Sequence, residues 1–190
     1  MRIAITGGIG AGKSHVCQHL RQYGIEVYDC DAAAKRLMRT SPEVRRALVR
    51  LVGKEVYAGR QLQKSVLAAF LLKSEANKQA VNDIVHPAVA ADFLESGLEW
   101  LESAILFDSR FDSRVSFDAV VCVTAPIETR IDRVMRRDGI SREKTLEWVN
   151  RQLPQEEMLR RSDYEIVNDG QQDLDLQIKE LIKQINHLNV

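Results

Sequence analysis

The chain has 190 residues, of which 45% are hydrophobic and 28% charged, and these fractions exclude a disordered, collagen-like or coiled-coil chain. Lys and Arg together number 27, as do Asp and Glu, so the net charge gives no reason to expect nucleic acid or an anionic membrane as a partner. Three cysteines without a C-x-x-C pair exclude a disulfide framework and favour a reducing, cytoplasmic setting. The longest apolar stretch near the middle, residues 119–127, is far shorter than the roughly 20 residues that span a bilayer.

The first elements along the chain are a strand, a glycine-rich turn, a helix and a second strand. Residues 2–6 predict the first strand and residues 13–23 the helix, which Gly24 ends. Residues 25–28 predict the second strand. This order indicates a βαβ unit, and therefore a parallel sheet with a right-handed crossover.

The glycine-rich turn, residues 7–14, matches the pattern G-x-x-x-x-G-K-[ST] in full. Glycines at these places let the backbone turn successive N–H groups inward on an anion. Lys13 is then expected to reach the β- and γ-phosphates of ATP, and Ser14 to offer its hydroxyl to Mg²⁺. The N-terminus of the following helix adds a favourable dipole. The pattern predicts a nucleotide-binding phosphate loop.

The remainder of the chain predicts an α/β fold. Residues 32–102 have helical periodicity and are too long for one crossover helix, so we expect a helical subdomain. Strands are predicted at 104–107, 119–123 and 164–167, with two helical stretches after Pro126 and an amphipathic helix at the C-terminus. The expected core is a sheet of about five parallel strands.

Two classes of protein use such a phosphate loop with ATP or GTP, and a third would only sense the nucleotide. A switch GTPase normally carries D-x-x-G and N-K-x-D, but no Asp here is followed three residues later by Gly. Asn77 and Lys78 form the chain's single Asn-Lys pair, and Gln79-Ala80 follows it. The sequence therefore favours a small-molecule kinase, with a non-catalytic nucleotide sensor as an alternative.

Two acidic residues, Asp29 and Asp31, follow the second predicted strand, at the sheet edge where open parallel sheets bind ligands. A carboxylate there can accept the proton of an acceptor hydroxyl or orient that hydroxyl for in-line attack on the γ-phosphate. Asp31 can equally cap a helix that begins at Ala32. Spacing alone does not separate these roles.

Arginines concentrate in the stretch that follows the strand at 119–123. Arg130, Arg133 and Arg137 have the spacing of one helix face, and guanidinium groups pair with phosphate oxygens in two-pronged fashion. A mobile segment with these arginines could close over ATP and exclude water. A solvated helix face is the alternative, because acidic residues are interleaved. The cluster comprises Arg133, Arg137, Arg142, Arg151, Arg160 and Arg161.

Asp108 and His86 are further candidates with two interpretations each. Asp108 ends the predicted strand 104–107, where an acid can hold Mg²⁺ or its waters, or cap the strand. His86 could contribute to a substrate pocket, or His86-Pro87 could mark the start of a helix with Pro at its first position.

Taken together, these segments resemble the dephospho-coenzyme A kinase family. The opening Ile5–Ser14 resembles that family's T-G-G-I-G-[SA]-G-K-S, and Asp29-Cys30-Asp31 its D-[AC]-D segment. The chain departs from the family pattern at two positions, with His15 in place of Thr and Asp108 in place of Glu. The other matching segments, in the family's order, are His86-Pro87, Leu106–Ser109, Arg133 to Asp138, Arg151-Gln152 and Asn168–Gly170.

The resemblance implies transfer of the ATP γ-phosphate to the 3′-hydroxyl of dephospho-coenzyme A, the last step of coenzyme A synthesis. It implies that Asp31 is the base or orienting acid, and we expect Lys13 and Arg137 to be the other catalytic residues. His86 and Asp108 would bind substrate with Asp31. The ATP phosphates would be held by Gly10, Ala11, Gly12, Lys13, Ser14 and His15.

The same resemblance implies a single kinase unit with three parts. The core would comprise residues 1–31, 103–137 and 163–190, the coenzyme A-binding subdomain about 32–102, and the lid about 138–162. A nucleoside or nucleotide kinase is the rival enzyme class. The expected partner is the small-molecule substrate, without nucleic acid or membrane, and the sequence leaves the oligomeric state open.

Overall fold

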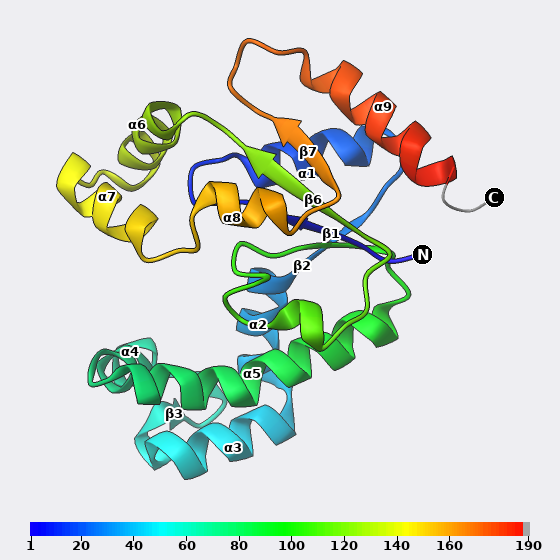
Figure 1. Ribbon diagram of the computed structural model, residues 1–190. Helices are drawn as coiled ribbons and strands as arrows, with labels where there is room; N and C mark the ends of the chain where they lie inside the picture. Colours follow the sequence, from blue (N-terminus) through cyan, green and yellow to red (C-terminus); the bar gives the residue numbers. More distant parts are fainter. Residues whose placement is uncertain (188–190) are drawn as a thin grey trace. The chain divides into compact units, whose positions relative to one another are not determined.

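The computed structural model describes residues 1–187, so residues 188–190, which the sequence analysis assigns to the core, lie outside the described residues. The chain divides into two compact units, which are coloured along the sequence in Figure 1. The first comprises residues 1–28 and the described residues from 98 onward, and the second comprises residues 29–97. Within residues 1–187, no helix has the length and apolarity needed to cross a membrane.

The first unit contains a five-stranded parallel sheet, which confirms the predicted fold class. The central strand β1 pairs with β5 on one side and β6 on the other, so that Ile3 lies opposite both Trp100 and Ala119. The strand order is β2-β5-β1-β6-β7. The strands are β1 (Ile3–Thr6), β2 (Val27–Asp29), β5 (Trp100–Glu102), β6 (Ala119–Thr124) and β7 (Tyr164–Val167).

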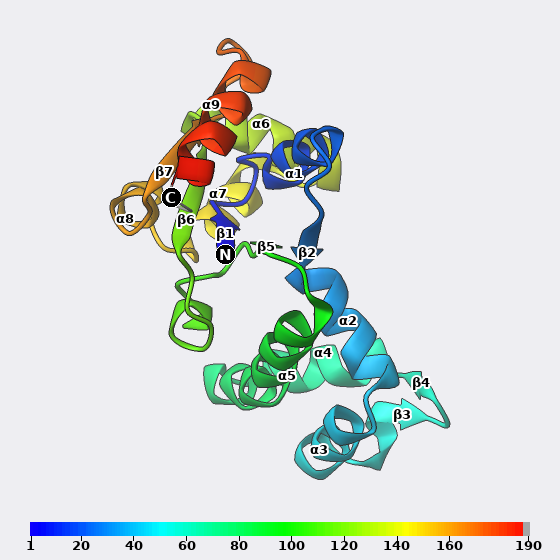
Figure 2. The same ribbon diagram turned by 90° about the vertical axis from the view of Figure 1, so that its right-hand side faces the viewer.

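Helices α1 and α9 bury their apolar faces against this sheet. Val16 and Leu20 of α1 join Ile178 and Ile185 of α9 in one core with the side chains of β1 and β6. These helices lie on the same side of the sheet in Figure 2. The helices of the first unit are α1 (Lys13–Gln22), η2 (Phe111–Ser113), α6 (Ile127–Asp138), α7 (Arg142–Asn150), α8 (Gln155–Arg160) and α9 (Leu174–His187).

The second unit is helical except for a two-stranded antiparallel hairpin. Its longest helix, α5, packs on α2, α3 and α4, and Leu48 and Val85 are buried there. Ser41 and Ser74 cap α3 and α5 by accepting hydrogen bonds from backbone N–H groups. Its elements are α2 (Cys30–Thr40), α3 (Pro42–Val52), η1 (Lys54–Val56), β3 (Tyr57–Ala58), β4 (Gln61–Leu62), α4 (Lys64–Leu72) and α5 (Glu75–Ser96).

The strand predicted at 104–107 is wrong. Trp100–Glu102 pairs with β1 instead, and residues 104–110 form turns. The Ser103 N–H still donates to the Ile5 carbonyl oxygen, and the chain turns away from the sheet after it, where the Ser103 hydroxyl accepts a hydrogen bond from the Ile105 N–H. Leu106 and Phe107 are nevertheless buried, so the apolar run reflects packing of a turn rather than a strand.

A second correction concerns His86 and Pro87. Both lie inside α5, eleven and twelve residues after its first residue, so Pro87 does not start a helix. Ser74 provides the N-cap of this helix, and Gly97 ends it in a left-handed conformation with φ of 73°. His86 is half-buried on this helix, within the second unit.

Candidate functional site

The phosphate loop between β1 and α1 requires glycine at its turns. Gly10 and Gly12 have φ of 79° and 89°, in the left-handed region that side chains disfavour. A Cβ atom would lie 2.4 Å from the Arg130 carbonyl oxygen at Gly10, and 2.1 Å from Asn168 Nδ2 at Gly12. Within residues 1–187, the N–H groups of Gly10 and Gly12 donate to no protein atom. They are therefore available to an anion, as the sequence pattern predicts.

Side chains from α6 and from the turn after β7 hold the loop from outside. Arg130 Nε donates to the Ile9 carbonyl oxygen at 2.9 Å, and Asn168 Nδ2 donates to the Ala11 carbonyl oxygen at the same distance. Arg133 makes longer contacts with the Gly10 and Ala11 carbonyl oxygens. Arg130 is only 4% exposed, and this burial lowers its pKa, although a guanidinium stays charged in protein environments.

The role of Arg130 was not predicted in this form. The sequence placed Arg130 on one helix face with Arg133 and Arg137, and all three do lie on α6. The face divides: Arg130 and Arg133 contact the loop, whereas the Arg137 guanidinium pairs in two-pronged fashion with the adjacent Asp138 carboxylate, at 2.9 and 2.8 Å. Asp138 thereby raises the pKa of Arg137.

A further contact, which the sequence analysis missed, ties the loop to the segment between α7 and α8. Gln152 Oε1 accepts a hydrogen bond from the Ile9 N–H at 2.7 Å. Because Arg130 holds the carbonyl of the same residue, Ile9 is fixed on both sides. The Arg151-Gln152 pair of the family resemblance was the one signal that could have pointed to this contact.

Lys13, Ser14 and His15 follow the loop into α1. Lys13 Nζ donates to the Gly7 carbonyl oxygen at 2.9 Å, so the ammonium lies within the loop. Ser14 is exposed at the first turn of the helix, where an oxygen ligand suits Mg²⁺. Burial, His19 and Arg133 lower the pKa of His15, whose ring lies 4.7 Å from that of His19. All three effects favour the neutral form of the His15 ring.

The cap of α2 is Asp29 and not Asp31. The Asp29 side chain accepts the hydrogen bond from the Ala32 N–H at 2.9 Å, and the helix begins at Cys30. Asp31 lies in the first turn of α2 with an exposed side chain. The capping interpretation of Asp31 is therefore wrong, and its carboxylate is not needed to start the helix.

Asp108 occupies a turn instead of a strand end. Its Oδ1 accepts a hydrogen bond from the Leu153 N–H at 3.2 Å, one residue after Gln152. This contact joins the turns after β5 to the same segment that reaches the phosphate loop. The interpretation of Asp108 as a cap at a strand end is wrong, because residues 104–110 form turns and its carboxylate accepts a backbone N–H from another segment. A role of Asp108 toward Mg²⁺ or substrate stays a prediction.

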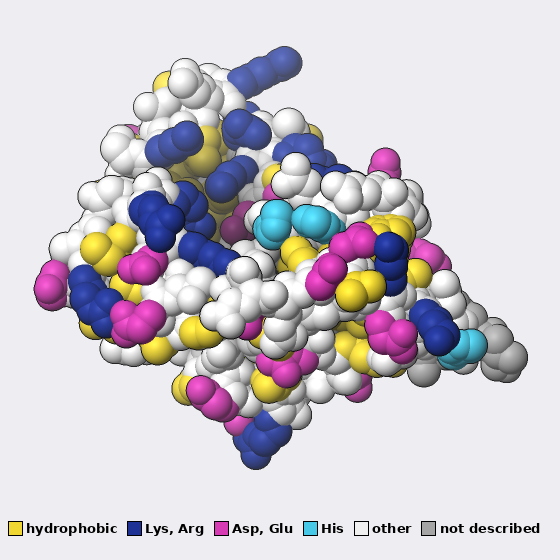
Figure 3. All heavy atoms as spheres, turned by 90° about the horizontal axis from the view of Figure 1, so that it is seen from above, with side chains coloured by type: hydrophobic (Ala, Val, Ile, Leu, Met, Phe, Trp, Pro, Cys, Tyr) yellow, Lys and Arg dark blue, Asp and Glu magenta, His cyan; other side chains and the backbone are white. Residues whose placement is uncertain are grey.

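All four arginines of the stretch 142–161 pair with glutamates. Figure 3 shows Lys and Arg side chains, in dark blue, gathered on the face it presents. Arg142 pairs with Glu128, and two pairs form across single helical turns, Arg151 with Glu147 and Arg160 with Glu157. Arg161 also reaches Glu157. Exposed pairs of this kind contribute little stability and open readily.

The predicted site residues divide between the two units. The phosphate loop, Asp108 and Arg137 belong to the first unit, and Asp31 and His86 belong to the second. In the first unit the structure brings residues 10–15 together with Arg133. It adds Arg130, Gln152 and Asn168 to the residues that shape the loop.

Comparison with known proteins assigns the chain to a family. The sequence profile of "Dephospho-CoA kinase" matches residues 1–173. A dephospho-CoA kinase from Bacteroides fragilis strain YCH46 is 41% identical over 189 residues, which cover 96% of this chain and 91% of that protein. The crystal structure of TT1252 from Thermus thermophilus superposes with a TM-score of 0.81 and 31% identity, covering 100% of this chain and 98% of the other.

Dephospho-CoA kinase from Campylobacter jejuni, at 19% identity and a TM-score of 0.68, shares the fold, covering 100% of this chain and 98% of that one. The matched residues 1–173 include the phosphate loop and all five strands of the parallel sheet. The chain belongs to the dephospho-CoA kinase family.

Proposed function

We propose that this kinase transfers the γ-phosphate of ATP to the 3′-hydroxyl of dephospho-CoA, giving CoA and ADP in the last step of CoA biosynthesis. The complete phosphate loop carries the proposal. Within residues 1–187 the N–H groups of Gly10 and Gly12 donate to no protein atom, and the Lys13 ammonium lies within the same loop. The family assignment supports the choice of acceptor.

ATP would be held by residues 10–15. The backbone N–H groups would bind the β- and γ-phosphates. The Lys13 ammonium would exchange its hydrogen bond with the Gly7 carbonyl for one with these phosphates, and would neutralise the negative charge that develops on them during transfer. The His15 ring, whose pKa is lowered by burial, His19 and Arg133, would serve as a hydrogen-bond donor.

Mg²⁺ fits the donors that the loop offers. The Ser14 hydroxyl is exposed, and within residues 1–187 it makes no hydrogen bond, so it is available as an oxygen ligand. Bound there with the phosphates, Mg²⁺ would supply charge neutralisation on the transferred group. The protein residues around it would position the phosphates.

Asp31 would orient the 3′-hydroxyl and accept its proton, because Asp29 already satisfies the helix terminus. His86 and Asp108 would contact the substrate, and Arg137 would leave Asp138 to bind a phosphate during transfer. The segment 138–162 would act as the lid, and residues 32–102 would supply the CoA-binding part. We place the enzyme in the cytoplasm, in keeping with three cysteines that form no C-x-x-C pair.

The test compares Asp31→Asn with Asp29→Ser. Asp31→Asn should lower kcat by about a hundredfold or more, because general base catalysis is lost, while the ATP dissociation constant stays unchanged. Asp29→Ser removes the neighbouring carboxylate but keeps a capping oxygen, so this control should retain kcat. Normal turnover by Asp31→Asn would remove Asp31 from the mechanism.

The acceptor is tested by ADP release from ATP and Mg²⁺. Dephospho-CoA should stimulate release, and AMP, adenosine and shikimate should not. Stimulation by one of these other acceptors alone would contradict the proposed substrate while leaving the kinase assignment intact. Absence of acceptor-dependent release would favour a nucleotide sensor.

A further inference from the structure

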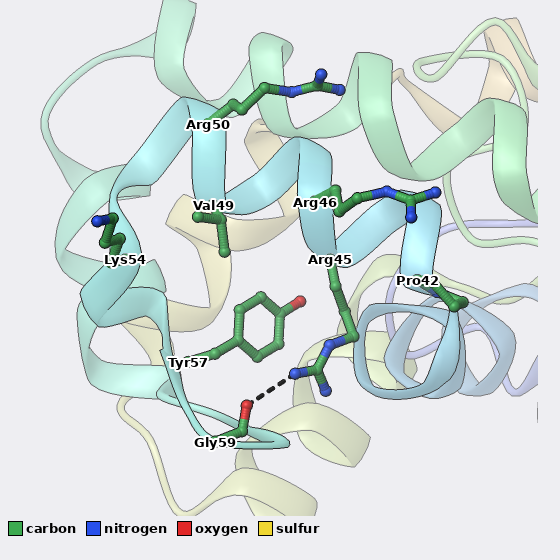
Figure 4. Close-up of a pocket in the computed structure, with 8 residues that line it drawn as sticks. All are labelled: Pro42, Arg45, Arg46, Val49, Arg50, Lys54, Tyr57 and Gly59. Carbon is green, nitrogen blue, oxygen red and sulfur yellow. Dashed lines mark hydrogen bonds between the residues drawn. The ribbon is translucent and has the colours of Figure 1, made fainter.

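A basic pocket lies within the second unit, between α3 and the β3–β4 hairpin (Figure 4). Its volume is about 650 Å³, within the range of small-molecule sites. The residues that line this basic pocket are Pro42, Arg45, Arg46, Val49, Arg50, Lys54, Tyr57 and Gly59. None of them belongs to the phosphate loop or is one of the single site residues named above, although all lie within residues 32–102, the proposed CoA-binding part.

The local charge is unbalanced in a chain whose total charge is zero. Residues 42–60 contain five cationic side chains and two acidic ones. Arg46 pairs with Glu43, but among the described residues no carboxylate pairs with Arg45, Arg50 or Lys54. The pocket therefore carries an excess of positive charge that the protein itself does not neutralise.

Arg45 is held in place by neutral groups. Its guanidinium donates to the carbonyl oxygens of Gly59 and Arg60, each at 2.8 Å, and lies 4.5 Å from the centre of the Tyr57 ring. The Tyr57 hydroxyl in turn donates to the Met38 carbonyl oxygen. These contacts fix the cation without cancelling its charge.

The floor of the pocket is apolar. In Figure 4, Val49 and Arg45 point from α3 toward Tyr57, while Arg46, Arg50 and Lys54 extend from the helix and the turn after it. A low-polarity floor strengthens the attraction between the fixed Arg45 and an anion. Arg50 lies in the last turn of α3 and Lys54 begins η1 after Gly53; both side chains are exposed and line the pocket.

We propose that the basic pocket binds a small anion that bears phosphate groups. Arginine forks and a lysine ammonium around one concavity match the charge and geometry of phosphate oxygens. Its volume of about 650 Å³ matches a small molecule better than an extended polyanion. The bound phosphate groups belong either to a free phosphate compound or to the diphosphate of dephospho-CoA, because both present the same phosphate oxygens.

The test uses inorganic pyrophosphate on the full chain. Because pyrophosphate also suits the phosphate loop, the titration is made in a Lys13→Ala variant and followed by backbone amide NMR. Saturable shifts confined to residues 42–60 are expected, with affinity falling as salt is added. Shifts only in residues 7–15, or none that saturate, would overturn the proposal.

Two variants in the Lys13→Ala background decide which residues bind. Arg50→Gln with Lys54→Gln leaves the hydrogen bonds of Arg45 intact and should weaken pyrophosphate binding by about tenfold or more. Arg39→Gln with Lys73→Gln also removes two positive charges, at exposed residues of the same unit outside the pocket lining, and should leave binding unchanged. Equal affinity in the variant of Arg50 and Lys54 would contradict the proposal.

Saturating dephospho-CoA then distinguishes the two sources. Displacement of pyrophosphate from residues 42–60 would identify the pocket as part of the substrate site. Binding of pyrophosphate in its presence would identify a separate anion site. Both results are independent of turnover, so failure of the proposed kinase reaction would not affect this experiment.

Discussion

Individual residues around the phosphate loop act mainly by holding its backbone. Arg130 illustrates this, because its side chain donates to the Ile9 carbonyl oxygen and its guanidinium lies against Gly8, where a Cβ atom would come within 2.2 Å of Nη2. A buried guanidinium is costly unless it is hydrogen-bonded, so its position indicates a specific structural contribution. Arg130 is a positioning residue rather than a catalytic one.

Replacement of Arg130 should weaken ATP binding. In Arg130→Gln the Ile9 carbonyl loses its partner and the loop gains freedom, which we expect to raise the ATP dissociation constant about tenfold, as measured by calorimetry. Arg136→Gln, on the exposed side of the same helix, is the control and should bind ATP normally. An unchanged ATP dissociation constant in Arg130→Gln would show that Arg133 and Asn168 suffice to hold the phosphate loop in its binding conformation.

Cys122 gives a pH-dependent stability that can be measured. Burial raises the pKa of its thiol to about 11 from the ordinary 9.0, so the folded state favours the protonated form. The stabilisation is present below pH 9 and is lost as pH rises toward the folded-state pKa. Between about pH 8.5 and 10.5 the free energy of unfolding should fall by about 2 kcal/mol more than in Cys122→Ala. Parallel urea titrations of the two proteins would refute this if their pH slopes agreed.

At the scale of elements, the segment between α7 and α8 connects two parts of the first unit, the phosphate loop and the turns after β5. Gln152 binds the Ile9 N–H of the phosphate loop, and the next residue, Leu153, donates its N–H to Asp108. Arg151, directly after α7, pairs with Glu147, and the exposed Arg160 of α8 pairs with the half-buried Glu157. These pairs are weak enough to exchange for phosphate, which suits the proposed lid.

Gln152→Ala tests the contact between this segment and the loop. One hydrogen bond of about 1 kcal/mol is lost, so KM for ATP should rise about fivefold, with a smaller change in kcat. Gln18→Ala, on the exposed face of α1, should leave both constants unchanged. A lower KM in Gln152→Ala would mean that the side chain competes with the nucleotide for the Ile9 N–H.

At the scale of the whole molecule, the chain builds two cores. Ile178 and Val121 are fully buried in the first unit, and Leu48 is fully buried in the second. All residues of the phosphate loop, and the described side chains that hold it, belong to the first unit. ATP affinity should therefore depend on the first core more than on the second.

Leu48→Ala separates stability from nucleotide binding. The cavity should lower the free energy of unfolding by about 3 kcal/mol, while the ATP dissociation constant of the folded protein stays the same. Leu94→Ala, at an exposed position of the same unit, should change neither quantity by a comparable amount. A parallel loss of ATP affinity in Leu48→Ala would show that the second core shapes the phosphate loop.

The sequence by itself determined the phosphate loop, the class of fold and the last strand. Residues 7–14 and 164–167 could be identified because glycine turns and strand patterns are encoded by neighbouring residues. The family followed from motifs distributed along nearly the whole chain. Mg²⁺, the lid and the substrate contacts stay predictions from the same source.

Only the tertiary structure decided which side chains hold the loop. The contacts of Ile9 with Gln152 and Arg130 join residues 143 and 121 positions apart, and no local pattern marks such partners. The strand at Trp100–Glu102 was missed for a related reason, since its pairing with β1 and not its own apolarity selects it over residues 104–107. Local chemistry fixed the anion-binding turn, and long-range packing fixed the residues that make it rigid.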